Sequence, residues 1–173
     1  MNKMIFFGLL YLIVLTACDN NHTGKDNLAA DSATITVPVP AVTDSMVNSL
    51  TVSEAEMKDD SVFADGSVPA SWANAGITDV KGLKLFLKRA QQWVMNNDKA
   101  KLAAAIRYPL KDITTEQELI AAYDKVFTKE VKLSFATINF NQVFRNQNGV
   151  MLGGGKVWIT QSGNDFFIFA INQ

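Results

Sequence analysis

The sequence has a single cysteine, Cys18, and a single histidine, His22, and both lie near its start. An intramolecular disulfide is therefore impossible, because it needs two cysteines. The rest of the chain also lacks the side chains for a His/Cys zinc site or for catalysis by a Ser-His or Cys-His pair. We expect no metal site and no cofactor.

The sequence also lacks an apolar run long enough for an ordinary membrane-spanning helix. Its apolar segment over residues 4–15 is shorter than the about 20 residues that cross a bilayer, and the polar residues 19–21 follow closely. Lys3 precedes this segment. A basic start before a short apolar run is typical of a signal peptide. We expect residues 1–17 to be a signal peptide rather than a permanent anchor.

The apolar segment ends in Leu15-Thr16-Ala17-Cys18. These residues resemble the lipobox of bacterial lipoproteins. The resemblance implies that Cys18 receives a diacylglyceryl group, that cleavage occurs just before it, and that the new amino group is acylated. Several acyl chains anchor a protein durably, so the lipid bilayer is the partner expected through Cys18. Ordinary secretory cleavage beside an incidental cysteine is the alternative.

Asp19 follows the lipidated position and resembles the signal that retains lipoproteins in the inner membrane. We therefore expect the protein in the cell envelope, on the periplasmic side of the inner membrane. The outer membrane is the alternative location.

Residues 18–75 show no lasting helical or strand period, and Asn, Asp, Ser, Thr, Ala and Val dominate them. Nine acidic residues and two lysines give this stretch a net charge of −7, whereas thirteen Lys and Arg and eight Asp and Glu give residues 76–173 a net charge of +5. Such a composition is typical of a disordered chain. We expect a flexible acidic tether, with a docking motif for a partner protein as the alternative.

Residues 76–173 can build one small core, and their first half predicts helices. Thr78 or Asp79 can cap a helix to about residue 97. A short Ala-rich helix over 99–106 and an extended segment follow, and a third helix begins at the capping box Thr115-x-x-Glu118. The expected inward side chains are Leu83, Phe86, Leu87, Ala90, Trp93 and Val94 in the first helix and Leu119, Ile120, Tyr123 and Phe127 in the third.

The second half predicts strands. Apolar and polar residues alternate over 131–135, which indicates a strand. Asn148-Gly149 is a strong hairpin signal. We expect one long strand over 150–160, bulged or bent at Gly153-Gly154-Gly155, and a last strand over 166–172. Helices followed by an antiparallel meander predict an α+β domain, with N-terminal helices packed on a curved antiparallel sheet.

This order of elements resembles the NTF2-like or cystatin-like cone, and the resemblance covers residues 76–173. Two segments are also similar to small secreted bacterial proteins of unknown function. They are Tyr108-Pro109-Leu110 and the Gly-Val-Met-Leu-Gly-Gly-Gly-Lys-Val-Trp segment over 149–158. The resemblance implies a fold but no function, because this superfold hosts enzymes, ligand binders and assembly modules.

Isomerases and dehydratases of the resembling fold use Asp and Tyr for acid–base chemistry, and the candidates here are Asp124, Tyr108 and Tyr123. Asp124 falls on the flank of its helix, so we expect it to be solvated. Tyr108, Tyr123 and Trp158 are the candidate ligand-binding residues, with a core position as the alternative for each. The triple glycine is not expected to bind phosphate, because no helix follows it.

Five lysines form a candidate surface for an anionic partner such as phospholipid heads, cell-wall polymer or an acidic protein. They are Lys81, Lys84, Lys88, Lys99 and Lys101. A solvated helix face is the alternative. Nucleic acid is not an expected partner in this compartment.

We therefore expect a membrane-anchored envelope lipoprotein whose small domain binds a protein or small molecule without catalysis. One alternative is an inhibitor or immunity protein against an envelope-acting enzyme, and another is a cofactor-free isomerase or hydrolase. Residues 166–171 are all apolar, so both faces of the last strand need cover. This predicts a homodimer through the sheet, with cover by the tether or by a curled sheet as the alternative.

Overall fold

The computed structural model describes residues 50–173, which all fall in one compact unit. The expected signal peptide, Cys18 and the beginning of the expected tether lie outside the described residues. Residues 50–75 differ from the expected tether, because they pack on the domain. The short helix α1 (Glu54–Met57) contacts α2, and Phe63 is buried. The folded part therefore begins before residue 76.

Helix α2 (Val80–Met95) is the longest helix of the described residues, and it begins where the sequence predicts. Asp79 caps it, with a carboxylate oxygen that accepts a hydrogen bond from the Gly82 N–H at 2.8 Å. The buried side chains are Leu83, Lys84, Phe86, Leu87, Ala90 and Val94. Lys84 is fully buried, so its expected place on an exposed face is wrong. Trp93 packs against the core but is only half-buried, so its inward position is confirmed in part.

Two further helices follow where they are expected. They are α3 (Lys99–Ala104) and α4 (Glu116–Val126), and the capping box of Thr115 and Glu118 forms at the start of α4. The inner side chains Leu119, Tyr123 and Phe127 are buried. Ile120 is 38% exposed, so its expected place on the inner face is wrong.

The expected strand over 131–135 is wrong, because the structure has helix α5 (Lys129–Ala136) there. Thr128 caps the helix and fixes its start. The buried side chains are Val131, Ser134 and Phe135. Val131 and Phe135 lie on the same face whether the segment is a strand or a helix. Leu133 between them is 57% exposed, as the helix requires.

Four antiparallel strands form one sheet in the order β1-β2-β3-β4. They are β1 (Phe144–Asn146), β2 (Gly149–Leu152), β3 (Val157–Ser162) and β4 (Asp165–Ile171). The β1–β2 hairpin forms at the predicted place, with Gln147 and Asn148 in its turn. This meander after the helices confirms the α+β class.

The expected single strand over 150–160 is wrong, because the chain reverses at the three glycines. Gly153–Gly155 form a 3-10 turn, and all three have positive φ values of 58°, 61° and 100°. Strands β2 and β3 are therefore neighbours, with Val150 opposite Ile159. The irregularity of the sheet lies after Trp158 instead.

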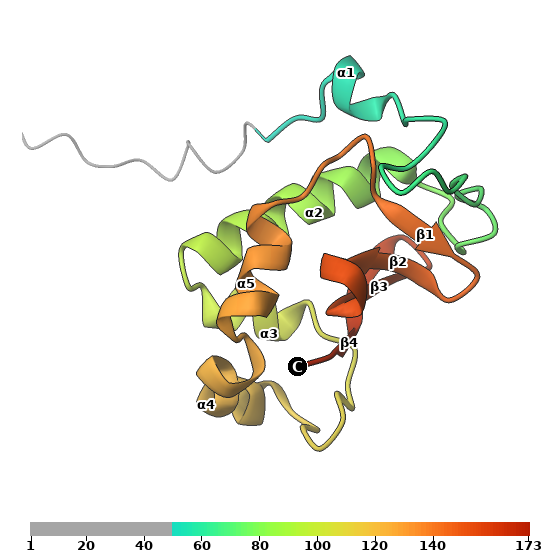
Figure 1. Ribbon diagram of the computed structural model, residues 1–173. Helices are drawn as coiled ribbons and strands as arrows, with labels where there is room; N and C mark the ends of the chain where they lie inside the picture. Colours follow the sequence, from blue (N-terminus) through green and yellow to red (C-terminus); the bar gives the residue numbers. More distant parts are fainter. Residues whose placement is uncertain (1–49) are drawn as a thin grey trace, which may run out of the picture. The chain divides into compact units, whose positions relative to one another are not determined.

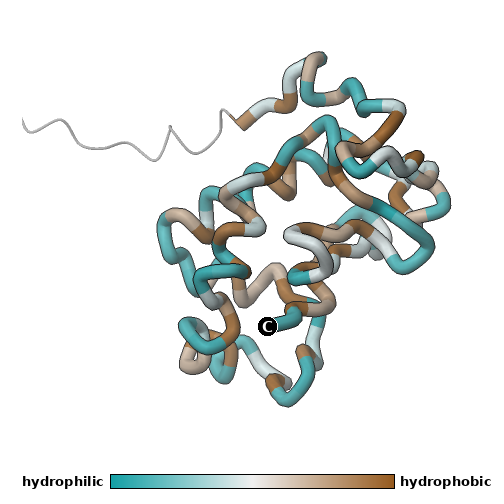
Figure 2. Tube along the Cα trace, viewed as in Figure 1, coloured by the Kyte–Doolittle hydropathy of each residue, from teal (hydrophilic) through white to brown (hydrophobic). Residues whose placement is uncertain are grey.

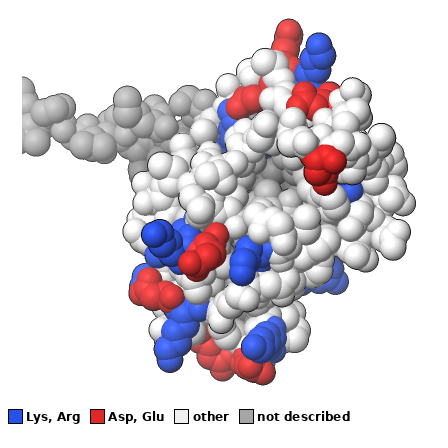
Figure 3. Space-filling model, in the orientation of Figure 1, with Lys and Arg blue, Asp and Glu red and all other residues white. Residues whose placement is uncertain are grey.

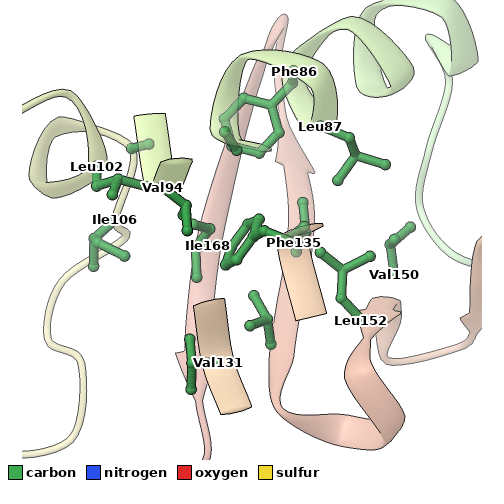
Figure 4. Close-up of a cluster of buried hydrophobic side chains, with 14 of the residues drawn as sticks. Phe86, Leu87, Val94, Leu102, Ile106, Val131, Phe135, Val150, Leu152 and Ile168 are labelled. Atoms are coloured by element: carbon green, nitrogen blue, oxygen red, sulfur yellow. The ribbon is translucent and has the colours of Figure 1, made fainter. Parts of the chain in front are cut away.

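The helices pack over one face of the sheet, and the core lies between the two layers (Figure 1). Hydrophobic and hydrophilic residues alternate along the helical segments (Figure 2), as expected for helices with one buried face. Figure 4 shows Leu87 of α2, Phe135 of α5 and Ile168 of β4 pointing into this common core. Within residues 50–173, no helix is long and apolar enough to cross a membrane.

Candidate binding face of the sheet

The sheet turns one face toward the helices and one face away from them. Side chains alternate along a strand, and the buried residues Val150, Ile159 and Ile168 lie side by side on the helix side. Their strand neighbours point to the other side, which we call the outer face. The outer face carries Met151, Trp158, Thr160, Phe167 and Phe169, all of them half-buried.

Phe169 follows the inward-facing Ile168 and therefore lies on the outer face, and a β-bulge occurs at this position. The register of β3 and β4 shifts between Trp158 and Ile159, which leaves Phe169 as the extra residue of β4. Its ring centroid lies 6.5 Å from that of Trp158. Gly149 lies against the same ring, and the neighbouring strand requires a glycine there, since a Cβ would lie 2.6 Å from the Ile159 carbonyl oxygen.

A cavity of about 370 Å³ opens beside Phe169. The segment after α3 forms one of its walls, because this segment pairs with β4. The Ile168 N–H donates to the Ala105 carbonyl and the Arg107 N–H donates to the Ile168 carbonyl, both at 2.9 Å. The lining residues are Arg107, Tyr108, Pro109, Asn148, Thr160 and Phe169.

Tyr108 is half-buried in the wall of this cavity. Its hydroxyl donates a hydrogen bond to the Ala103 carbonyl at 3.1 Å. Burial, and to a lesser extent the negative charge of Glu116, raise the pKa of Tyr108 to about 12. The phenol therefore stays protonated and neutral at ordinary pH.

Tyr123 lies away from this cavity, in the core. It is 1% exposed and stacks on Phe127 with 4.8 Å between the ring centroids. The ammonium groups of Lys99 and Lys132 lie 4.8 and 5.0 Å from its ring centroid. Its hydroxyl has no hydrogen-bond partner among the described residues. Burial, and to a lesser extent the negative charge of Asp124, raise the pKa of Tyr123. Tyr123 therefore matches the core alternative.

Asp124 is solvated, as its flank position predicts. Its side chain is 76% exposed and pairs with Lys99 at 3.4 Å and with Lys132 at 3.6 Å. The structure thus brings Tyr108 and Trp158 to the surroundings of Phe169, whereas Tyr123 and Asp124 lie elsewhere. The three candidates for acid–base chemistry do not share a site.

Sequence reasoning missed a buried charged cluster formed by Asp59, Trp72, Lys84 and Arg145. The Lys84 ammonium donates to Asp59 Oδ1 at 2.8 Å and to the Glu56 carbonyl at 2.6 Å. Asp59 Oδ2 accepts from the Trp72 indole N–H at 2.6 Å and from Arg145 at 3.2 Å. The Arg145 guanidinium lies 3.9 Å from the centroid of the Trp72 ring. Asp59 therefore fastens residues 50–75 to α2 and β1.

The two cations of this cluster are out of water, because Lys84 is 0% and Arg145 is 6% exposed. Burial lowers the pKa of Arg145, and the neighbouring Asp59 carboxylate acts in the opposite direction. A signal for this cluster was present in the sequence. Phe63 and Trp72 are large aromatic residues in a stretch that otherwise has the composition of a disordered tether, where aromatic residues are few.

The expected basic surface is largely neutralised within the chain. Four of its lysines form ion pairs with acidic side chains. Lys84 pairs with Asp59, Lys88 with Glu56 at 2.7 Å, Lys99 with Asp124 at 3.4 Å and Lys101 with Asp98 at 2.8 Å. Figure 3 shows acidic and basic side chains intermingled on the face that it displays. These pairs favour the alternative of a solvated helix face for the exposed lysines.

Within residues 50–173, no group of three or more His, Cys, Asp and Glu side chains is arranged to hold a metal ion. No family model, curated protein or solved structure matches the chain. The function is therefore argued from the outer face and its cavity.

Proposed function

We propose that the protein is a lipid-anchored lipoprotein of the cell envelope whose folded part is a non-catalytic binding module. The observation that carries this proposal is the outer face, where Trp158 and Phe169 form an aromatic surface beside a cavity of about 370 Å³. Small-molecule sites are concave, combine apolar walls with a few polar groups and measure about 300–1,000 Å³. The ligand binds at the Phe169 side of the outer face.

The chemistry of the cavity supports binding over catalysis. General acid–base catalysis works best with a group whose pKa lies near the working pH. The pKa of Tyr108 is about 12, and its hydroxyl is engaged by Ala103. No Asp or Glu is among the residues that line the cavity. The cavity therefore offers contacts for a ligand but no paired acid and base.

The arrangement of the elements supports a cone of the NTF2-like or cystatin-like type. The long helix α2 precedes the meander, and the helices cover one face of the sheet. This superfold hosts binding modules as well as enzymes. The proposed place of the domain is the periplasmic side of the inner membrane.

The anchor is tested by the substitution Cys18→Ser. The sequence Leu15-Thr16-Ala17-Cys18 supports lipidation at this residue, so the variant should remain an uncleaved, unlipidated precursor. Mass spectrometry of the wild-type protein extracted with detergent should show an acylated N-terminal cysteine. Mature wild-type protein free in the periplasm, without lipid mass, would contradict the anchor.

The binding face is tested by photo-crosslinking in intact cells. Benzoylphenylalanine replaces Trp158 on the outer face in one variant and Ile120 on α4 in a control. We expect an adduct at position 158 only, with a mass other than that of two crosslinked copies of the chain. An adduct with an envelope enzyme would favour the inhibitor or immunity alternative. Equal adducts at both positions, or none at position 158, would contradict the proposed binding face.

A further inference from the structure

We infer that the cavity beside Phe169 binds a small organic carboxylate that carries an apolar group. This inference rests on the proposed function, because it names the ligand class for the same site. The charge in the cavity, its hydrogen-bond donors and its apolar wall all support it.

Arg107 is the one charged residue among the six that line the cavity. Its side chain is exposed and makes no hydrogen bond or ion pair with the residues that the structure describes, whereas its backbone N–H is held by the Ile168 carbonyl at 2.9 Å. The residue therefore has a fixed position and a free guanidinium. Arginine binds a carboxylate through two parallel N–H···O hydrogen bonds.

Two other cavities of the described residues have acidic side chains among their lining residues. The cavity near the C-terminal residue is lined by Lys111 and Lys125 but also by Asp112. The groove between α2 and the β3–β4 hairpin carries two cations, Arg89 and Lys101, and two acids, Asp79 and Asp165. Acids in these walls would repel a carboxylate or occupy the cations. No Asp or Glu lines the cavity beside Phe169, and Arg107 has no ion pair within the described residues, so its positive charge is available to a ligand.

Neutral donors lie around the same cavity. The side-chain amide of Asn148 makes no hydrogen bond with the described residues. Its backbone N–H donates to the Asn146 side-chain oxygen at 2.8 Å, which fixes the position of the residue and leaves the amide free. The Thr160 hydroxyl has a single long contact of 3.4 Å with the Gln161 carbonyl. Both side chains can therefore turn a donor toward a carboxylate oxygen.

The remaining walls suit an apolar group. Phe169 and Pro109 contribute apolar surface to the cavity. Tyr108 adds its ring without adding charge, since burial raises its pKa to about 12 and keeps the phenol neutral. A ligand with a carboxylate at one end and an aromatic or aliphatic group at the other matches both parts of the cavity.

The test uses titration calorimetry on the full chain in nanodiscs of zwitterionic lipid, with empty discs as the blank. The probes are N-acetylphenylalanine, its uncharged amide, and 3-phenylpropionate, which lacks the peptide group. We expect both carboxylates to bind at least about tenfold more tightly than the amide, since ionised partners strengthen a hydrogen bond. Arg107→Gln should remove this preference and Arg107→Lys should retain part of it. Arg89→Gln is the matched control and should bind as the wild type does.

The outcomes separate the ligand class from the binding function. A preference for carboxylates that depends on Arg107 supports the inference. Binding of 3-phenylpropionate then indicates a free acid, and binding of N-acetylphenylalanine alone indicates the end of a peptide. Equal binding of the acid and the amide, unaffected by Arg107→Gln, would overturn the carboxylate class while the binding face stands. Absence of binding by every probe would also overturn the carboxylate class. The crosslinking experiment at position 158 would then still decide whether the outer face binds a ligand.

Discussion

The substitution Asp59→Asn tests whether residues 50–75 are part of the cooperative fold. The variant keeps the shape of the side chain but removes the charge that compensates Lys84 and Arg145. The amide keeps only one acceptor oxygen, so it cannot accept the hydrogen bond from Lys84 and those from Trp72 and Arg145 at the same time. Leaving buried cations without their partner typically costs about 3–5 kcal/mol. Because the Asp59 side chain is 21% exposed, we expect the lower end, about 3 kcal/mol.

Urea unfolding of a chain of residues 43–173, followed by circular dichroism, measures this loss. With an m-value of about 2 kcal/mol/M, the unfolding midpoint should fall by about 1.5 M. Asp60→Asn is the matched control, because Asp60 is exposed and accepts one hydrogen bond, from Gln142 at 2.7 Å. Its unfolding free energy should change by no more than about 0.5 kcal/mol. Equal midpoints for the two variants would refute the reasoning and favour a tether that extends to residue 75.

Three further predictions concern stability and assembly. Gly153→Ala should cost about 2–4 kcal/mol in urea unfolding, because φ is +58° and the new Cβ would lie 1.9 Å from the Ser134 hydroxyl oxygen. Gly163→Ala has a φ of +61° in open space and should cost less; equal losses would contradict the clash. The pKa of Glu56 is lowered from 4.5 to about 2, chiefly by its hydrogen bond from Lys88, so its stabilisation is present above about pH 4.5 and is lost toward pH 2. The melting temperature of Glu56→Gln should therefore lie below that of the wild type at pH 7 and converge with it toward pH 2, and a constant difference would contradict this. Sedimentation of residues 43–173 should show a dimer that Phe167→Glu on the outer face dissociates, since apolar surface on an open sheet favours association; a wild-type monomer at tens of micromolar would contradict it.

Helix starts were predictable because their signals are local. Asp79 and Thr115 bond to backbone groups three residues away, at 2.8 Å and 3.2 Å. A capping interaction of this kind is complete within one turn, whatever the rest of the chain does. The β1–β2 turn depends in the same way on a few consecutive residues. These elements therefore appear where the sequence places them.

The errors arise where two structures share one local pattern. Val131 and Phe135 lie on the same face in a strand and in a helix, so alternation over five residues could not distinguish them. Positive φ values suit glycine in a bulge and in a reversal alike. At Gly153 the close approach of Ser134 from α5 shows a packed reversal, and that contact is not visible in the order of residues.

The candidate site was predictable only in part. Tyr108 and Trp158 were named as candidate ligand-binding residues, and both lie near Phe169. Arg107 was not singled out, because an arginine in an extended segment carries no pattern of its own. Phe169 belonged to an apolar run, and the register shift that leaves it without a partner residue in β3 depends on the pairing of two strands.

By itself the sequence determined the chemical inventory and the local elements. The described domain has no cysteine and no histidine, so thiol and imidazole chemistry are absent from residues 50–173 whatever their fold. Only the tertiary structure decided the burial of Lys84, whose partner Asp59 lies 25 residues away in the chain, and of Arg145, which is 86 residues from the same carboxylate. The physical reason is that burying a lysine costs desolvation energy, which only acceptors supplied by distant parts of the chain can offset. The helical period of the sequence alone therefore does not predict that the Asp59 carboxylate lies beside Lys84.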